Sequence, residues 1–290
     1  PGHGAGSTCG KGLGAVPFTT VGYEKRYNTV LASAAEGEDA FVATLLEGQP
    51  EPQMYFARMK RDNRDGPPLL GDLPSPRRLT ADELSSAVED GRALIVDTRL
   101  DRSAFMARHI PGSLYAPMDR SFNTAVGSLV VDEKRPLLLI VDEEDVEEAV
   151  RDLVRIGYDN LPAFADTSTL ERYFTRGGEA TSVPEVDFRE VARLREEPGT
   201  AVLDVRFGSE YHEGHIPGAV NASYTRLPEY LESRVPEGKA LLVHCASGAR
   251  SAVAAAYLAA HGRDVHYVNG DWSEWVESGR PVEAAEATAA

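Results

Sequence analysis

One of the two cysteines in the chain stands where an apolar run meets a loop of small residues. The segment from Ala240 to Ser251 reads Ala-Leu-Leu-Val-His-Cys-Ala-Ser-Gly-Ala-Arg-Ser. This pattern predicts a buried strand, a short loop and the start of a helix, with Cys245 at the carboxyl end of the strand. Main-chain N–H groups at a helix N-terminus stabilise negative charge, so they favour a Cys245 thiolate and also bind an incoming oxyanion. The segment therefore predicts a nucleophilic cysteine.

The residues that follow Cys245 support this prediction. Small side chains let the backbone curl so that its amides converge on the sulfur, and we expect four of them to bind the substrate: Ala246, Ser247, Gly248 and Ala249. Arg250 adds a planar cation that suits a sulfonate or a phosphate, so we expect it to act in catalysis with Cys245. A buried, inert cysteine is the alternative, but such a residue needs neither the glycine nor the arginine.

The length of the loop separates two kinds of cysteine chemistry. Five residues between the cysteine and the arginine make a wide cradle that fits a phosphate, whereas four make a tighter ring that suits a persulfide. Four residues separate Cys245 from Arg250. A persulfide, in which the cysteine carries one extra sulfur atom, is therefore favoured. A cysteine-dependent phosphatase, with which His244 beside the cysteine is also compatible, remains the alternative.

An internal repeat indicates which elements position this loop. Leu-Ile-Val-Asp-Thr-Arg at 94–99 and His-Ile-Pro-Gly-Ser at 109–113 return as Val-Leu-Asp-Val-Arg at 202–206 and His-Ile-Pro-Gly-Ala at 215–219. The order and the separation of the two motifs are kept, which indicates two copies of one domain of about 100 residues each.

Strand and helix patterns alternate within each copy. This alternation is typical of an α/β fold, with a central and mainly parallel sheet flanked by helices. The expected strands cover residues 93–96, 137–141, 201–205, 240–244 and 265–268. One expected helix begins at Thr80, and the others cover residues 147–156, 188–196 and 250–261. The helix at 147–156 ends before Gly157, and the helix at 250–261 ends before Gly262.

Composition and charge restrict the partners. The chain has 290 residues, of which 42% are hydrophobic, and its net charge is −16. This charge repels phosphate backbones and anionic lipid headgroups, so we expect neither nucleic acid nor a membrane as a partner. No secretory signal and no membrane-spanning stretch is apparent, and only two cysteines occur. These features predict a cytoplasmic protein in a reducing compartment.

Four motifs in the second copy occur together in a known family. They are Asp204-Val205-Arg206, His215 with Ile-Pro-Gly-Ala, the Cys245 to Arg250 loop and Asn-Gly-Asp-Trp-Ser-Glu-Trp at 269–275. With these motifs the segment resembles the rhodanese (thiosulfate sulfurtransferase) family.

The resemblance implies that residues 179–290 are a catalytic rhodanese domain, with a disordered tail from about residue 283. It also implies a Cys245 persulfide that takes sulfur from thiosulfate or a low-molecular-weight persulfide and passes it to a thiol or to cyanide, without a cofactor. Asp204, Arg206 and His215 are expected to be structural residues of the motifs.

The first copy, residues 77–178, lacks this chemistry. Aligned on the apolar strand, it has Val141 or Asp142 at the position of Cys245, and the acidic run from Asp142 to Asp145 follows. We expect this copy to be an inactive rhodanese-like domain that acts as a scaffold or an interface. The run suits a solvated helix N-terminus better than a metal site, and it repels anionic substrates. A pair of repeats that only docks partner proteins, without catalysis, remains an alternative for the whole chain.

Residues 1–76 belong to neither copy. Pro1 to Lys11 and Val21 to Arg26 resemble the last part of a metallo-β-lactamase-fold persulfide dioxygenase, and Pro52 to Gly71 resembles the segment that follows it in fusions with rhodanese domains. This resemblance implies an incomplete tail of that fold and a missing N-terminal domain that it joins in cis. Only one helix, near residues 40–47, is expected in this part, which is too short and too polar to bury a core.

The same resemblance implies iron chemistry in the parent protein. A complete dioxygenase domain would hold iron through histidines and a carboxylate, but the chain has no His-x-His-x-Asp-His stretch. His3 is at most a remnant near the metal site of the parent domain, and Cys9 is expected to be a bystander. No metal site is therefore predicted in this chain. The sequence leaves open whether the chain forms a homo-oligomer.

Overall fold

The computed structural model describes residues 18–47 and 51–284. The chain divides into two compact units, one ending at Pro52 and the other beginning at Gln53. Residues 53–76, which were expected to belong to the N-terminal segment, group with the two repeats. Within the described residues, no helix is long and apolar enough to cross a membrane.

The described part of the first unit is helical. It contains α1 (Val21–Tyr27), α2 (Thr29–Ser33) and α3 (Glu38–Leu46). The helix expected near residues 40–47 corresponds to α3, while α1 and α2 were not expected. The side chain of Asn28 caps α2 by accepting hydrogen bonds from the N–H groups of the first turn. Between residues 18 and 47 only Ser33 is buried, so this segment contains no apolar core of its own.

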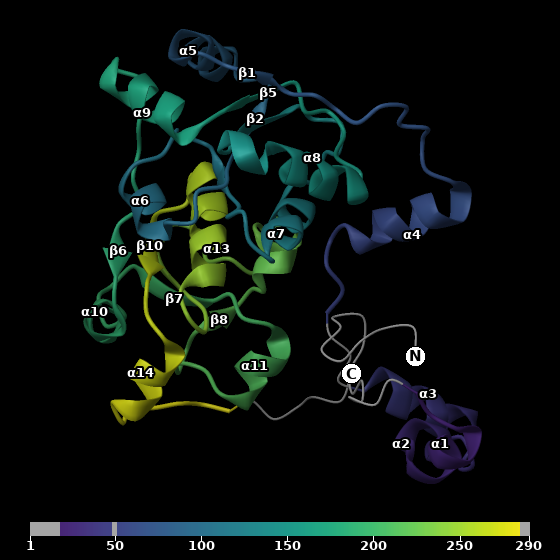
Figure 1. The fold of residues 1–290 in the computed structure, drawn as a ribbon. Coiled ribbons are helices and arrows are strands. Elements are labelled where there is room, and N and C mark those ends of the chain that lie inside the picture. Colours follow the sequence, from purple (N-terminus) through teal and green to yellow (C-terminus); the bar gives the residue numbers. More distant parts are fainter. Residues whose placement is uncertain (1–17, 48–50, 285–290) are drawn as a thin grey trace. The chain divides into compact units, whose positions relative to one another are not determined.

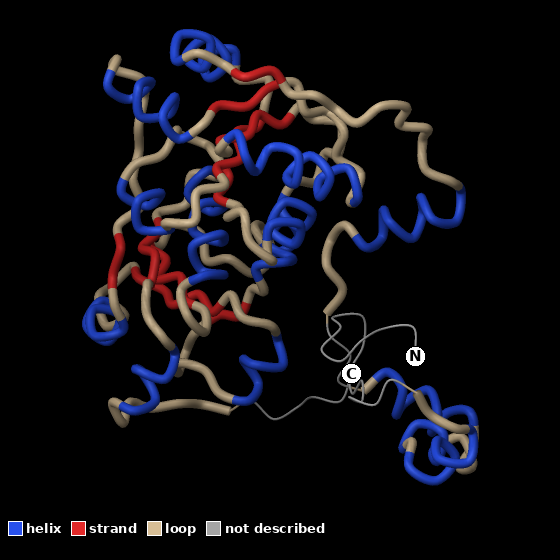
Figure 2. Tube along the Cα trace, in the orientation of Figure 1, coloured by secondary structure: helices blue, strands red, loops and turns tan. Residues whose placement is uncertain are grey.

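The second unit contains two five-stranded sheets with the same strand order. The first runs β1-β5-β4-β2-β3 and the second β6-β10-β9-β7-β8, and each neighbouring pair is parallel. Figure 2 shows the strands as two separate groups. The strands of the first sheet are β1 (Arg77–Arg78), β2 (Leu94–Asp97), β3 (Leu114–Tyr115), β4 (Leu137–Ile140) and β5 (Ala163–Ala165). Those of the second are β6 (Glu185–Val186), β7 (Thr200–Asp204), β8 (Val220–Asn221), β9 (Ala240–His244) and β10 (Val265–Val268). The internal repeat read from the sequence is therefore a repeat of topology.

Helices connect the strands in the same order in both repeats (Figure 1). The first repeat is preceded by α4 (Phe56–Asp65) and contains α5 (Ala81–Asp90), α6 (Arg102–Ala107), α7 (Phe122–Leu129), η1 (Glu143–Asp145), α8 (Val146–Arg155) and α9 (Thr167–Thr175). The second contains α10 (Phe188–Leu194), α11 (Gly208–Glu213), η2 (Tyr224–Arg226), α12 (Leu227–Tyr230), α13 (Ala249–Ala260) and α14 (Trp272–Glu277). The expected helix starting at Thr80 is confirmed, because Thr80 and Glu83 form a reciprocal capping box at α5.

Alternation along the strands divides the apolar residues between two faces. In β4 and just beyond it, Leu137, Leu139 and Val141 face one core, whereas Leu138 and Ile140 face another. The first of these cores also contains residues of the second sheet and of α13, so the repeats share one continuous core. Figure 1 shows α7 and α13 between the two sheets. The two repeats are therefore packed against each other and are not independent domains joined by a linker.

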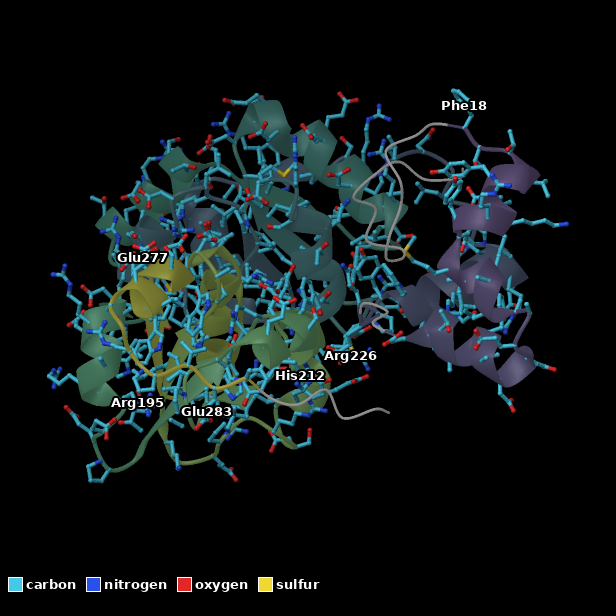
Figure 3. All side chains as sticks on the ribbon, turned by 90° about the horizontal axis from the view of Figure 1, so that it is seen from below. Phe18, Arg195, His212, Arg226, Glu277 and Glu283 are labelled. Carbon is cyan, nitrogen blue, oxygen red and sulfur yellow. The ribbon has the colours of Figure 1, made fainter. Side chains whose placement is uncertain are left out.

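Each repeat closes with a short bridge to its own histidine motif. His109 pairs with Thr181 after the first repeat, and His215 pairs with Glu283 after the second. Glu283 is labelled in Figure 3. Two main-chain hydrogen bonds join Glu283, near the expected start of the tail, to His215. Residues 285–290 lie outside the described residues.

A buried arginine fixes α4 to the first repeat. Arg58 is 9% exposed, and it donates a short hydrogen bond to the carbonyl of Ile156 and pairs with Glu133 at 3.4 Å. Its guanidinium carbon also lies 4.4 Å from the centre of the Tyr158 ring. These contacts explain why α4 belongs to the second unit although the sequence around it is polar.

Candidate active site

Cys245 is the first residue after β9, and its side chain lies on the side of the shared core. Leu241, Val243 and Cys245 alternate onto the face that packs against the first repeat. Cys245 is 1% exposed. The loop amides were expected to converge on a sulfur that an incoming oxyanion can reach, but in the structure this sulfur is covered.

The loop after Cys245 leaves its main-chain donors available. The helix α13 begins at Ala249 without a side-chain cap and without an acidic residue in its first turn. Among the described residues, no acceptor takes a hydrogen bond from the N–H groups between Ala246 and Arg250. Unpaired N–H groups at a helix N-terminus bind anions. The four predicted substrate-binding residues thus supply main-chain donors next to Cys245.

The shape of the loop depends on Gly248. Its φ of +85° lies in the left-handed region, which favours glycine. The hydroxyl groups of Tyr267 and Ser251 donate to the Gly248 carbonyl at 3.0 and 3.1 Å. A Cβ at this position would stand 2.8 Å from Oδ1 of Asn269, which is closer than packed atoms allow. The backbone conformation therefore favours glycine here, and any larger residue would also have to displace neighbouring side chains.

Replacing Gly248 with alanine is expected to disable the loop. In Gly248→Ala the methyl group strains the left-handed backbone and displaces the side chain of Asn269, and displacement of groups next to a reacting sulfur costs on the order of a hundredfold in turnover. Gly262→Ala is the matched control, because Gly262 also has a positive φ, of +73°, but its Cβ would meet nothing within 4 Å. Sulfur-transfer rates measured for both variants test this. Equal activity of the two variants would show that the contact at Gly248 is unimportant.

Arg250 is engaged by a carboxylate of its own repeat. Its two terminal nitrogens donate to the two oxygens of Glu210, at 2.5 and 2.8 Å. Burial raises the pKa of Glu210, but the hydrogen bonds and charge of Arg250 hold that pKa below its usual value. Arg250 was expected to act in catalysis by binding an anionic group. In the structure its charge is balanced by Glu210, and the pair connects the loop to α11.

Asp204 and Arg206 form a buried pair at the end of β7. Two oxygens of Asp204 accept from the guanidinium of Arg206 at 2.6 to 3.0 Å, and the side chains are 0% and 4% exposed. Arg206 also donates to the carbonyl of Gly214 at 2.6 Å and lies 4.5 Å above the Trp272 ring. Burial raises the pKa of Asp204, yet His244 and Arg206 bring that pKa below its usual value. The pair holds the chain that follows β7 in place.

His215 has contacts of a structural residue. Its Nδ1 lies 2.9 Å from the carbonyl oxygen of Tyr211, and its ring stacks on the Tyr211 ring at 3.7 Å. Its backbone forms the bridge to Glu283. These contacts are made to its own repeat and away from the Cys245 loop.

His244 precedes Cys245 but faces the opposite side of the sheet. It is fully buried and stacks with Trp272, with ring centres 5.7 Å apart. Its Nε2 lies 3.6 Å from Oδ2 of Asp204 and has no hydrogen-bond partner within the described residues. Burial lowers the pKa of His244, against the attraction of Asp204. His244 therefore packs below the loop and does not line it.

The buried imidazole gives the fold a pH dependence. The pKa of His244 is lowered in the folded state, so below about pH 6.5 the unfolded chain binds a proton that the native protein does not. Stability therefore falls as the pH drops through this range, by at most about 1.4 kcal/mol per pH unit for one group. We expect the unfolding free energy of His244→Asn to change less between about pH 7.5 and about pH 5.5 than that of the unaltered protein. These values lie roughly one unit either side of the free pKa of histidine. Denaturant titrations measure it.

The control is His212→Asn, because His212 is exposed (Figure 3). It should keep the pH dependence of the unaltered protein. An unchanged pH dependence in His244→Asn would contradict this assignment.

The sheet register fixes what replaces Cys245 in the first repeat. Asp97 pairs with Ile140, as Asp204 pairs with His244, so the residue equivalent to Cys245 is Val141. Val141 is buried, and the side chain of Asp142 accepts from the N–H of Thr167 at 3.0 Å. The ambiguity between Val141 and Asp142 is thereby resolved. The first repeat has neither the cysteine nor the arginine of the loop.

The described residues do not fit the iron site of a dioxygenase. They contain no group of three His, Cys, Asp or Glu side chains that could hold a metal ion. His3 and Cys9 lie outside the described residues. No step of the chemistry below is therefore assigned to a metal.

Comparison with known proteins matches both repeats to the same domain family. The model for the Rhodanese-like domain matches residues 80–167 and 187–278. A sulfurtransferase of Allochromatium vinosum is 31% identical over 106 residues, which cover 36% of this chain and 98% of that protein. A thiosulfate sulfurtransferase of Shewanella oneidensis is 28% identical over 99 residues, 34% of this chain and 97% of that protein.

Some solved structures overlap a longer part of the chain, and one of them is a metallo-beta-lactamase. A metallo-beta-lactamase from Staphylococcus aureus is 32% identical, with a TM-score of 0.46, over 57% of this chain. The chain spans 44% of that protein.

Proposed function

The chain belongs to the rhodanese-like domain family, and from this membership we propose that it transfers sulfane sulfur through a persulfide on Cys245. The observation that carries the proposal is the position of Cys245 at the carboxyl end of β9, followed by unpaired main-chain donors and the start of α13. The curated relatives named above are sulfurtransferases. The first repeat, with Val141 in place of the cysteine, is a scaffold and an interface.

The reaction has two displacements. The Cys245 thiolate attacks the outer sulfur of thiosulfate, the sulfur–sulfur bond of the donor breaks, and sulfite leaves with the bonding electron pair. The enzyme then holds a Cys245 persulfide anion. An acceptor thiolate attacks the outer sulfur of this persulfide, and the Cys245 thiolate is restored as the acceptor becomes a persulfide. Charge is conserved in both steps, and no oxidant is needed.

The surrounding residues provide the setting for these steps. The donors between Ala246 and Arg250 stabilise the negative charge that stays on sulfur throughout. The pair of Arg250 and Glu210 keeps the far end of the loop fixed to α11. Because Cys245 is buried, water has little access to the persulfide.

We propose thiosulfate and low-molecular-weight persulfides as donors, and a small thiol as acceptor. Thiosulfate is named as the substrate of one relative. A metallo-β-lactamase-fold domain in cis, with persulfide dioxygenase activity that uses iron, stays a prediction for a longer protein.

The test is a steady-state assay of sulfur transfer. The protein, incubated with thiosulfate and cyanide, is expected to form thiocyanate, with sulfite released at the same rate. The same preparation, given an aryl phosphate, is expected to release no phosphate, because the loop of four residues is short for a phosphoryl group. Phosphate release without thiocyanate would favour the phosphatase alternative. If neither thiocyanate nor phosphate forms, the alternative of a non-catalytic pair of docking domains is favoured.

A further inference from the structure

The first repeat places a cation against the loop that follows Cys245. Arg102 is the first residue of α6, and its guanidinium carbon lies 3.2 Å from the point where a Cβ on Gly248 would stand. A hydrogen bond from Asn269 to Ser103 at 3.2 Å fixes the same helix beside the end of β10. Figure 1 shows α6 next to β10 and α13. Arg102 therefore belongs to one repeat and lies at the active loop of the other.

The arginines around Cys245 differ in how their charge is balanced. Arg206 is paired with Asp204, and Arg250 is paired with Glu210. Arg102 is partly buried, yet it has no hydrogen bond or ion pair to any residue in the described part of the chain. Of these three cations, only Arg102 has its charge and its donors free for a ligand.

The nearby carboxylates are engaged elsewhere. Asp101 caps α6 by accepting from the N–H of Ala104 at 3.0 Å. Glu185 accepts from the side-chain amide of Asn269 at 2.7 Å. Neither neutralises Arg102.

Stabilisation of the fold does not explain this arginine. A cation in the first turn of a helix opposes the helix dipole, so Arg102 weakens α6 slightly where it stands. Its charge also acts on the side chains of two buried tyrosines, one in each repeat. Burial raises the pKa of Tyr115 and of Tyr267, and Arg102 acts against that rise in both cases. Tyr267 is the residue that holds the Gly248 carbonyl.

We propose that Arg102 of the first repeat binds the anionic group of the sulfur donor, a sulfonate or a carboxylate, while the donor sulfur faces Cys245. This inference rests on the sulfurtransferase function proposed above and assigns to Arg102 the role that the sequence suggested for Arg250. The inactive repeat then contributes directly to substrate recognition. An arginine fork suits the paired oxygens of a sulfonate or a carboxylate, which fits thiosulfate and acidic low-molecular-weight persulfides.

The test uses Arg102→Gln and compares thiosulfate with a persulfide donor that carries no anionic organic group. With thiosulfate, KM is expected to rise about tenfold or more, as for the loss of one charged contact, while kcat changes less than about twofold. With a small persulfide whose organic group is uncharged as donor, Cys245 takes the outer sulfur and a thiolate leaves, and kcat/KM is expected to stay the same. Arg102→Lys is expected to recover part of the affinity for thiosulfate, because it keeps the charge without the fork.

The control variant is Arg108→Gln, which removes the same charge just beyond the other end of α6, where Arg108 pairs with exposed Glu171. It is expected to leave both donors unaffected. An unchanged KM for thiosulfate in Arg102→Gln would overturn the inference, and so would an equal loss with both donors, which indicates a merely structural role. If the unaltered protein accepts sulfur from neither donor, the proposed function itself fails.

Discussion

Replacing Cys245 with serine is expected to abolish sulfur transfer. Serine keeps the size of the side chain, but its hydroxyl is not ionised at neutral pH and cannot hold a transferable sulfur. Removing the nucleophile of a covalent mechanism costs at least about a thousandfold in kcat. The rate of thiocyanate formation from thiosulfate and cyanide measures this loss.

The matched control is Cys9→Ser, which changes the other cysteine of the chain. It is expected to retain full activity. Substantial turnover in Cys245→Ser, or a comparable loss in Cys9→Ser, would remove Cys245 from its central role. Thermal unfolding of the Cys245 variant should match that of the unaltered protein within a few degrees, because the substitution is small.

Removing the carboxylate of Asp204 is expected to cause the largest loss of stability. In Asp204→Ala the guanidinium of Arg206 keeps its place below the surface, 4% exposed, without a counter-charge. Breaking one side of a buried ion pair costs on the order of 3 to 5 kcal/mol. Equilibrium unfolding in urea at neutral pH measures the change. If Asp204→Ala does not fold, Asp204→Asn, which keeps one acceptor oxygen, provides the measurement with a smaller loss.

The first repeat offers an internal comparison for this variant. Asp97 and Arg99 form the equivalent pair at 2.8 Å, but Arg99 is 11% exposed. Water can therefore solvate Arg99 in part after Asp97→Ala, and the loss of stability should be smaller than for Asp204→Ala. Equal losses, or no loss at Asp204, would contradict the view that burial makes the second pair essential.

Local sequence patterns were sufficient to predict the strands and helices that position the site. The apolar run at 240–244 forms β9, and the alanine-rich run after Gly248 forms α13, because each pattern matches the period of its element. The repeat of Asp97 and Asp204 predicted two domains, and the two sheets have the same strand order. These features depend on neighbours in sequence, so the sequence alone predicts them.

Contacts between distant elements were not predictable in the same way. Glu210 and Arg250 are 40 residues apart, and no spacing rule connects them. The position of Arg102 at Gly248 depends on how two repeats pack, which periodicity does not encode. The burial of Cys245 has the same origin, since the first repeat covers the face on which it lies. One feature could have drawn attention to Arg102. It stands at the start of a helix, where a cation opposes the helix dipole and does not stabilise the helix.

The central claim is that Cys245 carries sulfur, and the most direct test is the mass of the intact protein. After incubation with thiosulfate and removal of the excess, we expect a gain equal to one sulfur atom, mapped to the peptide that contains Cys245. Addition of cyanide or a small thiol should remove it. A protein that takes up no sulfur, or takes it up on Cys9 alone, would contradict the account.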